Sequence, residues 1–465
     1  MITFGTDGWR GIIARDFTFD NLHLVALATA TYLKKTNPKN PSVVIGYDTR
    51  FMSKEFAEET AKILAWKGII VNLTDTFSTT PQVSFQTKQK NVDLGIVITA
   101  SHNPPIYNGY KLKATFGGPA TPEQIKALEK DLKRISKNPP ILKFKELEDY
   151  RKLDKIRIFD AKESYLRSIK NKIDINAIKK ANFKILYDPM YGAGMGQLKT
   201  LLPNSNEIHN VFNPSFGDID HPEPIAEHLY ELAILVKNDK YDIGLATDGD
   251  ADRLGVIDET GHFVDAHKVF MILLKYLHQY RKKQGSVVKT VSLTSMVDKY
   301  CEKYGLTLHE TPVGFKHTAK IMSQEKVLIG GEESGGLGTI LHIPERDGLF
   351  NGLLLLEAMA VRNKKISELC NELDEEFGPH RYLRKDVRVT ESKKIKILNA
   401  CKKHPKKIGR FQVLSINEKD GYKFILKDAW LLIRASGTEP LLRFYAEAKS
   451  LRKVNEILEE AMKLT

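Results

Sequence analysis

Short apolar runs alternate with longer amphipathic stretches along most of this chain, and this alternation constrains the fold more than any other feature. Asn21–Lys35 and Ser53–Lys67 have helical periodicity, whereas Ser42–Tyr47 and Leu94–Ile98 are short apolar runs. The alternation continues to about residue 363. Because parallel strands need a long crossover between them, usually a helix, the pattern predicts α/β domains with mixed, mostly parallel sheets.

The last part of the chain has a different character. Strand-like segments follow one another there without helices between most of them, and a helical segment, Val454–Lys463, comes after them. This predicts a smaller C-terminal α+β domain with an antiparallel sheet. The predicted division is into residues 1–150, 151–253, 254–370 and 371–465.

Composition limits the class of protein. A chain of 465 residues with 42% hydrophobic and 28% charged residues fits a globular protein of three or four domains. No apolar run approaches the ~20 residues that a membrane span needs, and no signal peptide is expected. Three cysteines, Cys301, Cys370 and Cys401, are too few and too scattered for a disulfide framework. Reduced thiols predict a cytoplasmic protein with no membrane partner.

The net charge of +13 raises the question of nucleic-acid binding. The lysines are scattered, however, and no stripe interleaves arginines with aromatic residues, so we expect no nucleic-acid partner. A positive field raises the local concentration of small anions instead. The charge therefore favours small anionic ligands.

Ser101 lies in the turn Thr99–Pro104, directly after the apolar run Leu94–Ile98. The carboxyl ends of strands are where open α/β sheets place their chemistry. A serine in such a turn is usually only a turn former. Ser101 becomes a candidate reactive residue because three other loops of the chain suit a phosphorylated group.

The first of these loops contains three closely spaced carboxylates. Asp248, Asp250 and Asp252 follow the apolar run Tyr241–Ala246, and Arg253 comes next. Such carboxylates repel one another unless a cation lies between them, and oxygen ligands favour Mg²⁺ or Ca²⁺. A calcium EF-hand requires glycine at its sixth position, where this loop has Arg253, so an EF-hand is rejected. A guanidinium beside a metal suggests a nearby phosphate.

The other two loops offer groups for a sugar and for a phosphate. Gly330–Gly336 combines glycines, which allow close approach of a ligand, with Glu332 and Ser334, which suit vicinal hydroxyls. Arg434–Pro440, with Arg443 behind it, supplies guanidinium groups, hydroxyls and backbone N–H groups that can surround a phosphate dianion.

In this order and spacing, the four loops resemble the α-D-phosphohexomutase family. The family has a phosphoserine loop, a DGDxDR metal loop, a GEES-type sugar loop and an RxSGTEP phosphate loop. The segment Phe4–Gly11 resembles the amino-terminal segment of the family as well. The resemblance implies a cytoplasmic isomerase of carbohydrate metabolism, with four domains around a central cleft.

The resemblance also implies the reaction. Ser101 would carry a phosphate, pass it to a hexose phosphate to give a hexose 1,6-bisphosphate, and take the other phosphate back. That bisphosphate would act as intermediate and activator. Arg10 and Arg253 would flank the phosphate, and Lys111 or His102 would serve as the general base. Mg²⁺ would bind to the serine, Ser101, and to the three carboxylates of the acidic loop, Asp248, Asp250 and Asp252. Neighbouring cations are expected to lower the pKa of Lys111.

The ligand-binding residues follow from the same resemblance. Glu332 and Ser334 would hold the 3- and 4-hydroxyls of the sugar, and Lys316 would be a further sugar contact. The phosphate that does not react would be held by a C-terminal set, Arg434, Ser436, Gly437, Thr438 and Arg443.

The identity of the sugar is less constrained. Glucose, mannose and glucosamine differ at carbon 2, which neither Glu332 nor Ser334 would address. The segment His342–Gly348 resembles phosphoglucomutases, so glucose phosphates are favoured, with phosphomannomutase or phosphoglucosamine mutase as alternatives. A metal-dependent phosphatase and a basic nucleic-acid-binding protein are the competing classes. Both a monomer and a homodimer remain open.

Overall fold

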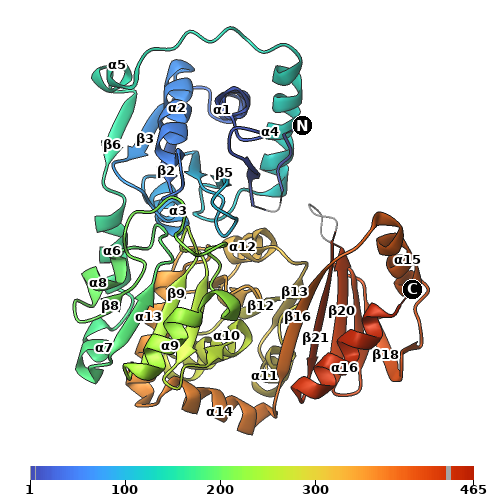
Figure 1. Cartoon of the computed structure of the whole chain (residues 1–465). Helices are drawn as coiled ribbons and strands as arrows, with labels where there is room; N and C mark the ends of the chain where they lie inside the picture. The colour runs from blue at the N-terminus through green and yellow to red at the C-terminus, as the bar shows by residue number, and fades with distance from the viewer. Residues whose placement is uncertain (1, 6, 436–440, 465) are drawn as a thin grey trace.

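Four β-sheets organise the chain, three of them mixed and covered by helices and the fourth antiparallel (Figure 1). The structure is a computed structural model, and it describes residues 2–5, 7–435 and 441–464. The first sheet lies at the top of Figure 1, the second and third lie beneath it, and the fourth stands to the right of the third. The predicted fold class, three α/β units and a smaller C-terminal α+β unit, is confirmed.

The first sheet has the strand order β1-β5-β4-β2-β3-β6. Its central strand β4 is buried along its whole length, as expected for an apolar strand with helices on both sides. α3 begins with a capping box in which Thr79 and Gln82 bond each other's backbone N–H groups. The strands are β1 (Trp9–Ile12), β2 (Ser42–Tyr47), β3 (Ile70–Thr74), β4 (Leu94–Ile98), β5 (Tyr107–Lys113) and β6 (Ile156–Phe159). The helices are α1 (Phe19–Thr36), α2 (Ser53–Trp66), α3 (Thr80–Gln89), α4 (Pro122–Lys137) and α5 (Leu147–Lys152).

The second sheet has the order β11-β10-β9-β7-β8. β9 and β10 are antiparallel neighbours, so the acidic loop is the turn of a hairpin. Strands on both sides of this loop agree with the rejection of an EF-hand, which needs helices there. The strands are β7 (Ile185–Asp188), β8 (Asn206–Glu207), β9 (Ile243–Thr247), β10 (Leu254–Asp258) and β11 (Phe263–Val264). The helices are α6 (Lys162–Lys170), α7 (Ile175–Ala181), α8 (Gln197–Leu201), the 3₁₀ turn η1 (Ala226–His228) and α9 (Tyr230–Asn238).

The third sheet has the order β13-β12-β14-β15 and shares its core with the second. α13 is buried from Gly348 to Met359 and packs against elements of both units. The strands are β12 (Ser286–Thr290), β13 (Leu308–Thr311), β14 (Val327–Gly331) and β15 (Leu337–Thr339). The helices are α10 (Ala266–Lys275), the π-helical turn η2 (Tyr276–Tyr280), α11 (Met296–Tyr304), α12 (Phe315–Gln324), α13 (Gly348–Arg362) and α14 (Ile366–Phe377).

The fourth sheet is antiparallel, with the order β16-β21-β20-β19-β18-β17, and has a core of its own. Polar groups join it to the third unit: the Nζ of Lys423 donates to the carbonyl oxygen of Val291 at 2.7 Å, and Glu447 accepts from the backbone N–H of Ser295 at 3.0 Å. The strands are β16 (Arg381–Arg388), β17 (Lys407–Ile408), β18 (Phe411–Asn417), β19 (Tyr422–Leu426), β20 (Ala429–Ala435) and β21 (Leu441–Ala448). The helices are α15 (Glu391–Lys402) and α16 (Leu451–Met462).

The exact domain boundaries stay a prediction. β6 pairs with the first sheet although it lies beyond residue 150, and β10 pairs with the second sheet although it lies beyond residue 253. Among the described residues, no helix has the length and apolar character needed to cross a bilayer.

Candidate active site

Ser101 occupies a buried and conformationally unusual turn after β4. Its φ is 56°, in the left-handed region that non-glycine residues seldom adopt, and only 1% of the residue is exposed. Its backbone N–H donates to the hydroxyl of Thr99, which itself donates to Asp48 at 2.5 Å. The guanidinium of Arg50 donates to the carbonyl oxygen of Ser101 at 2.6 Å and pairs with Asp48 at 3.2 Å. Several buried bonds therefore fix this strained turn.

The hydroxyl of Ser101 meets the acidic loop of the second unit directly. Its Oγ donates to Oδ2 of Asp248 at 2.7 Å, across 147 positions of sequence. A Cβ on Gly249 would lie 2.6 Å from the carbonyl oxygen of Ser101, so the two loops approach as closely as only glycine permits. The tertiary fold therefore brings together the predicted reactive serine and the predicted metal loop.

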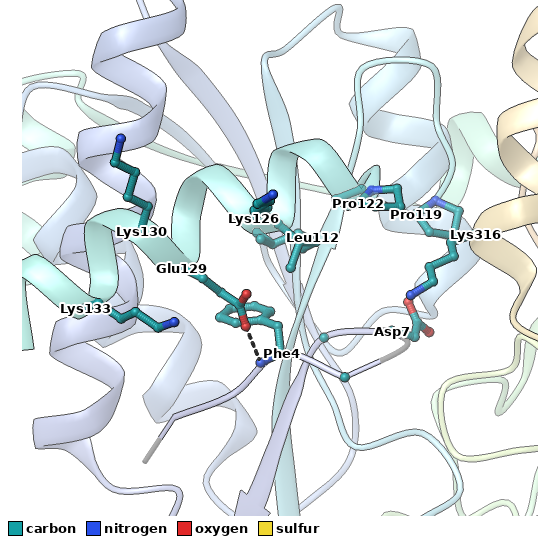
Figure 2. Close-up of a pocket in the computed structure, with 14 residues that line it drawn as sticks. Phe4, Asp7, Leu112, Pro119, Pro122, Lys126, Glu129, Lys130, Lys133 and Lys316 are labelled. Atoms are coloured by element: carbon teal, nitrogen blue, oxygen red, sulfur yellow. Dashed lines mark hydrogen bonds between the residues drawn. The ribbon is translucent and has the colours of Figure 1, made fainter. Parts of the chain in front are cut away.

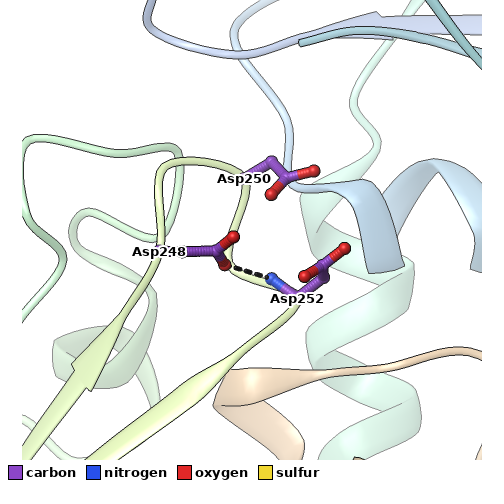
Figure 3. A group of neighbouring side chains, drawn as sticks. All are labelled: Asp248, Asp250 and Asp252. Carbon is purple, nitrogen blue, oxygen red and sulfur yellow. Dashed lines mark hydrogen bonds between the residues drawn. The ribbon is translucent and has the colours of Figure 1, made fainter. Parts of the chain in front are cut away.

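The three aspartates of the loop converge as a metal site requires (Figure 3). All three are buried, and one oxygen from each lies within 4.8 Å of the others. Burial, together with Asp252 and Asp250, raises the pKa of Asp248 well above its ordinary value. Within the described part of the chain, Oδ1 of Asp250 and Oδ1 of Asp252 are buried and have no hydrogen-bond partner. Crowded carboxylates with unbonded, buried oxygens fit a divalent cation with oxygen ligands, and Mg²⁺ is the ion expected for this donor set.

The amino-terminal end of α3 supports the metal loop from the first unit. The hydroxyl of Thr80 donates to Oδ2 of Asp250 at 2.5 Å, and its backbone N–H donates to the carbonyl oxygen of Asp250 at 2.9 Å. The sequence analysis did not predict Thr80, and its position after a helix-capping threonine was the available signal.

Lys111, on β5, lies fully buried among carboxylates. Its Nζ is 2.7 Å from Asp250, 2.9 Å from Asp7 and 3.3 Å from Asp252. Burial alone lowers the pKa of Lys111, but Asp250, Asp7 and Asp252 outweigh it and the pKa is raised. The prediction of a lowered pKa was wrong, because carboxylates rather than cations dominate the surroundings of this amine. Asp7 was not predicted as a site residue.

His102 lies beside the serine hydroxyl, and Arg253 and Arg10 act on this histidine. Nδ1 of His102 is 3.5 Å from Oγ of Ser101, and its Nε2 is 3.5 Å from the guanidinium of Arg253. Burial, Arg253 and Arg10 hold the pKa of His102 well below its usual range. Arg10 bonds Asn103 at 2.5 Å, and Arg253 pairs with Glu223 at 2.5 Å. The surroundings of His102 therefore disfavour its protonated form.

Arg346 links the amino-terminal segment, the acidic loop and the sugar loop, and it was missed as a site residue. It pairs with Asp252 at 2.5 Å, with Asp7 at 2.9 Å and with Glu332 at 3.5 Å. Only 7% of it is exposed. The segment His342–Gly348 was noted in the sequence only for its resemblance. Nothing local to that segment indicates which distant carboxylates its arginine reaches.

The sugar-loop residues lie around this arginine. Oε1 of Glu332 accepts from the backbone N–H of Gly314 at 2.9 Å. Burial raises the pKa of Glu332, while Arg346 acts against that shift. Ser334 is half-buried in the same loop, and Lys316, near the start of α12, extends toward Asp7 in Figure 2.

The C-terminal arginines stand on a different sheet. Arg434 and Arg443 are register partners on β20 and β21. Each lies beside a carboxylate of its own unit, Arg434 at 2.8 Å from Asp420 and Arg443 at 3.4 Å from Asp386. The remaining predicted phosphate ligands, Ser436, Gly437 and Thr438, lie outside the described residues.

Comparison with known proteins agrees with this geometry. Models of phosphoglucomutase/phosphomannomutase alpha/beta/alpha domains I, II and III match residues 1–139, 163–261 and 265–377, and the model of the C-terminal domain matches residues 385–464. A phosphoglucomutase/phosphomannomutase of Thermococcus kodakarensis is 33% identical, over 99% of this chain and 98% of its own. A phosphoglucosamine/phosphogalactosamine mutase of Sulfurisphaera tokodaii is 32% identical, with 99% and 98% coverage.

A solved structure extends the likeness to three dimensions. The crystal structure of a Thermus thermophilus protein, provisionally named a phosphomannomutase, has a TM-score of 0.87 and 34% identity, covering 100% of this chain and 98% of its own. Fold, site and relatives together define a phosphohexomutase, an isomerase that moves a phosphate within a hexose phosphate. The chain belongs to the α-D-phosphohexomutase superfamily and has its phosphoglucomutase/phosphomannomutase four-domain architecture.

Proposed function

We propose that this chain interconverts glucose 1-phosphate and glucose 6-phosphate, with Ser101 as the carrier of the transferred phosphate. The observation that carries the proposal is the 2.7 Å contact between Oγ of Ser101 and Asp248, inside a buried cluster of carboxylates. Phosphoryl transfer depends chiefly on positioning and on neutralising charge. Bound to Asp248, Asp250 and Asp252, Mg²⁺ would offset the negative charge of the transferred group.

The residues around Ser101 would divide the remaining work. Arg10 and Arg253 supply guanidinium donors for the phosphate oxygens, and the turn keeps Oγ directed toward the acidic loop. His102 is 3.5 Å from Oγ and its surroundings lower its pKa, so it is placed to accept a proton as a general base. Lys111 is the alternative base, and it would act once its carboxylate partners are engaged elsewhere. In the first transfer, the attacking sugar hydroxyl loses a proton and the serine oxygen gains one as the phosphate departs. In the second transfer, the serine hydroxyl loses that proton and the sugar oxygen that gives up its phosphate gains one.

The sugar must be held in two opposite orientations, because each of its ends receives and gives up a phosphate. Glu332, Ser334 and Lys316 would hold ring hydroxyls that keep similar positions in both orientations. The phosphate at the far end would be held by Arg434 and Arg443 together with Ser436, Gly437 and Thr438. Hexose 1,6-bisphosphate is then both the intermediate and the compound that restores a dephosphorylated enzyme.

A second sugar is favoured by a specific observation. Curated relatives that are as similar as the phosphoglucomutase/phosphomannomutase of Thermococcus kodakarensis include phosphoglucosamine mutases, for example at 32% identity in Sulfurisphaera tokodaii. Glucosamine 1-phosphate is therefore the second candidate, and mannose 1-phosphate is the third. The proposal applies equally to a monomer and to a homodimer.

Two measurements test the proposal. Coupled assays with glucose, mannose and glucosamine 1-phosphates should give the largest kcat/KM for glucose, and inactivity on glucose 1-phosphate would overturn the choice of sugar. Intact-protein mass should show one phosphate, mapped to the peptide that contains Ser101. A phosphatase would instead release free phosphate and gain nothing from added glucose 1,6-bisphosphate.

A further inference from the structure

A large pocket lies beside the candidate active site, between α4 of the first unit and α12 of the third (Figure 2). Its volume is about 690 Å³, within the range of small-molecule sites. Phe4, Leu112 and Ile125 supply apolar surface to its wall. Asp7 belongs both to this pocket and to the ion pairs around Lys111, so the pocket adjoins the reaction centre without containing Ser101 or the acidic loop.

Positive charge on this pocket is not balanced by the carboxylates that line it. Lys126, Lys130 and Lys133 of α4 all line the wall and are exposed. Within the described ranges, none of the three forms a hydrogen bond or an ion pair. The lining carboxylates are already used, Asp7 by Lys111 at 2.9 Å and Glu129 by the backbone N–H of Phe4 at 3.1 Å.

The spacing of the three lysines favours an elongated anion. Positions 126, 130 and 133 share one face of a helix, and seven residues of helix rise about 10.5 Å. Figure 2 shows these side chains spread along α4, from Lys133 to Lys126, with Lys316 lying beyond Lys126. One phosphate contacts the whole row only if the three side chains bend toward a single point, whereas a chain of two or three phosphates can contact them as they are spread. The apolar wall beside the row suits a ring.

From this geometry we infer that the pocket binds a polyphosphate, in the form of a nucleoside di- or triphosphate whose base contacts the apolar wall. Its phosphate chain lies along Lys126, Lys130 and Lys133. Inorganic polyphosphate shares the charged part of this chemistry but lacks the ring. Lys316, which the proposed function assigns to the sugar, also lines this pocket, so the two sites adjoin. The three lysines of α4 belong to the polyphosphate site alone, and neither site depends on the other.

Calorimetric titration of the full-length protein tests the site. ATP, inorganic tripolyphosphate and AMP are titrated without divalent cations, so that chelation and the acidic loop do not interfere. The variant Lys126→Ala/Lys130→Ala/Lys133→Ala is compared with Lys143→Ala/Lys145→Ala/Lys152→Ala. The second variant removes equal charge from exposed lysines that do not line the pocket, at and before α5. Circular dichroism and phosphohexomutase turnover confirm that both variants are folded.

We expect ATP affinity to fall in the pocket variant and not in the control variant. ATP binds the unmodified protein and the control variant alike, and the pocket variant binds it about tenfold or more weakly, which is about 1.4 kcal/mol. AMP binds at least about tenfold more weakly than ATP because it reaches only part of the row. ATP binding tighter than tripolyphosphate supports a nucleotide, and equal affinities assign the site to inorganic polyphosphate.

Three results would overturn the site. Equal weakening in both variants would mean adsorption to a basic surface. Unchanged affinity in the pocket variant would place ATP elsewhere, for example at the sugar-phosphate site. Absence of binding to the unmodified protein at about 1 mM ATP would remove the site altogether. None of these results bears on the proposed mutase reaction, because the three lysines belong to none of its predicted catalytic or binding residues.

Discussion

Two regions of this molecule would hold the phosphates of the sugar, and they are built in opposite ways. Around Ser101, the donors and carboxylates are buried and come from three units of the fold, as the contacts of Arg346 with Asp7, Asp252 and Glu332 show. In the C-terminal unit, Arg434 and Arg443 are half-buried and pair with acids of their own unit. The first region is assembled across the chain, and the second within one unit.

The difference suits two different tasks. Transfer of a phosphoryl group needs atoms held in fixed positions, and buried charge networks provide this because each unpaired group would be costly. Holding the far phosphate of a sugar that must bind in two orientations needs affinity but less exact placement. Half-exposed guanidinium groups, whose ion pairs are weakened by solvent, can exchange an internal carboxylate for a ligand at small cost.

The strongest test of the comparison is Ser101→Ala. Loss of the nucleophile should reduce turnover by about 1,000-fold or more, while the free energy of unfolding falls by only about 1 kcal/mol, because a single buried hydrogen bond is lost. Steady-state assays and urea melts measure the two effects. Ser205→Ala is the control, because Ser205 is a buried serine whose hydroxyl donates to the nearby carbonyl oxygen of Leu202. Full activity of Ser101→Ala would exclude the phosphoserine role.

Removal of one carboxylate should give the next largest effect. In Asp250→Asn we expect turnover to fall about 100-fold and the Mg²⁺ concentration for half-maximal activity to rise, because a charged ligand is lost from a buried site. A Mg²⁺ titration of activity measures both. Asp258→Asn, on β10 but outside the cluster, should behave as the unmodified protein. An unchanged Mg²⁺ requirement in Asp250→Asn would place the metal elsewhere.

The variant Arg346→Ala tests whether the ion pairs of Arg346 stabilise the reaction centre. Three carboxylates would lose a buried partner, so the free energy of unfolding should fall by about 3 kcal/mol, and kcat should fall more than KM rises. Denaturant melts and steady-state kinetics test this. Arg362→Ala, which removes a half-buried arginine paired with Glu372, should cost much less. Similar losses in the two variants would contradict a special role for Arg346.

Arg443→Ala should show the contrasting behaviour of the C-terminal unit. A charge-assisted bond to phosphate contributes about 1.5–3 kcal/mol, so KM should rise about 10- to 100-fold with a small change in the free energy of unfolding. Kinetics with glucose 1-phosphate measure the change. Arg452→Ala, at an exposed position of the same unit, is the control. A collapse of kcat with constant KM would show that both regions work in the same way.

The smallest expected effect is on the pH dependence of stability, and it comes from an ion pair near the metal loop. The side chain of His209 lies 3.0 Å from the buried Asp188. The carbonyl oxygen of His209 accepts from the backbone N–H of Tyr191, and two residues later the backbone N–H of Ala193 donates to Gly249 in the metal loop. The hydrogen bond to Asp188 raises the pKa of His209. A raised histidine pKa stabilises the fold below the ordinary value of about 6.5, and the gain is lost as pH rises through the folded pKa.

Thermal melts between pH 6 and 8 test this ion pair. The unmodified protein should lose a few tenths of a kcal/mol across this range from His209, since solvent screens a half-buried pair. His209→Gln should lose that part of the pH dependence, and His262→Gln, at an exposed turn, should keep it. Identical pH profiles for His209→Gln and the unmodified protein would show that the ion pair contributes nothing to stability.

Much of the site was predictable because its loops follow strands that short-range sequence patterns predict. Apolar runs that end in glycine, serine or aspartate predicted strand ends, and the structure has β4 before Ser101 and β9 before Asp248. The predicted antiparallel C-terminal sheet was confirmed for the same reason, since alternation and turns are short-range signals. Arg346 and Asp7 carried no such signal, and Thr80 offered only its position after the helix-capping Thr79. Each owes its place in the site to a partner far away in sequence.

The sequence by itself determined the class of fold, the order of the four loops and the residue types that suit a phosphate and a divalent cation. The tertiary structure decided how these groups affect one another: that Ser101 lies 2.7 Å from Asp248, and that Lys111 is surrounded by carboxylates that raise its pKa. The physical reason is range. Strand and turn preferences act over a few residues, whereas burial and charge depend on every group that folding brings within a few ångströms.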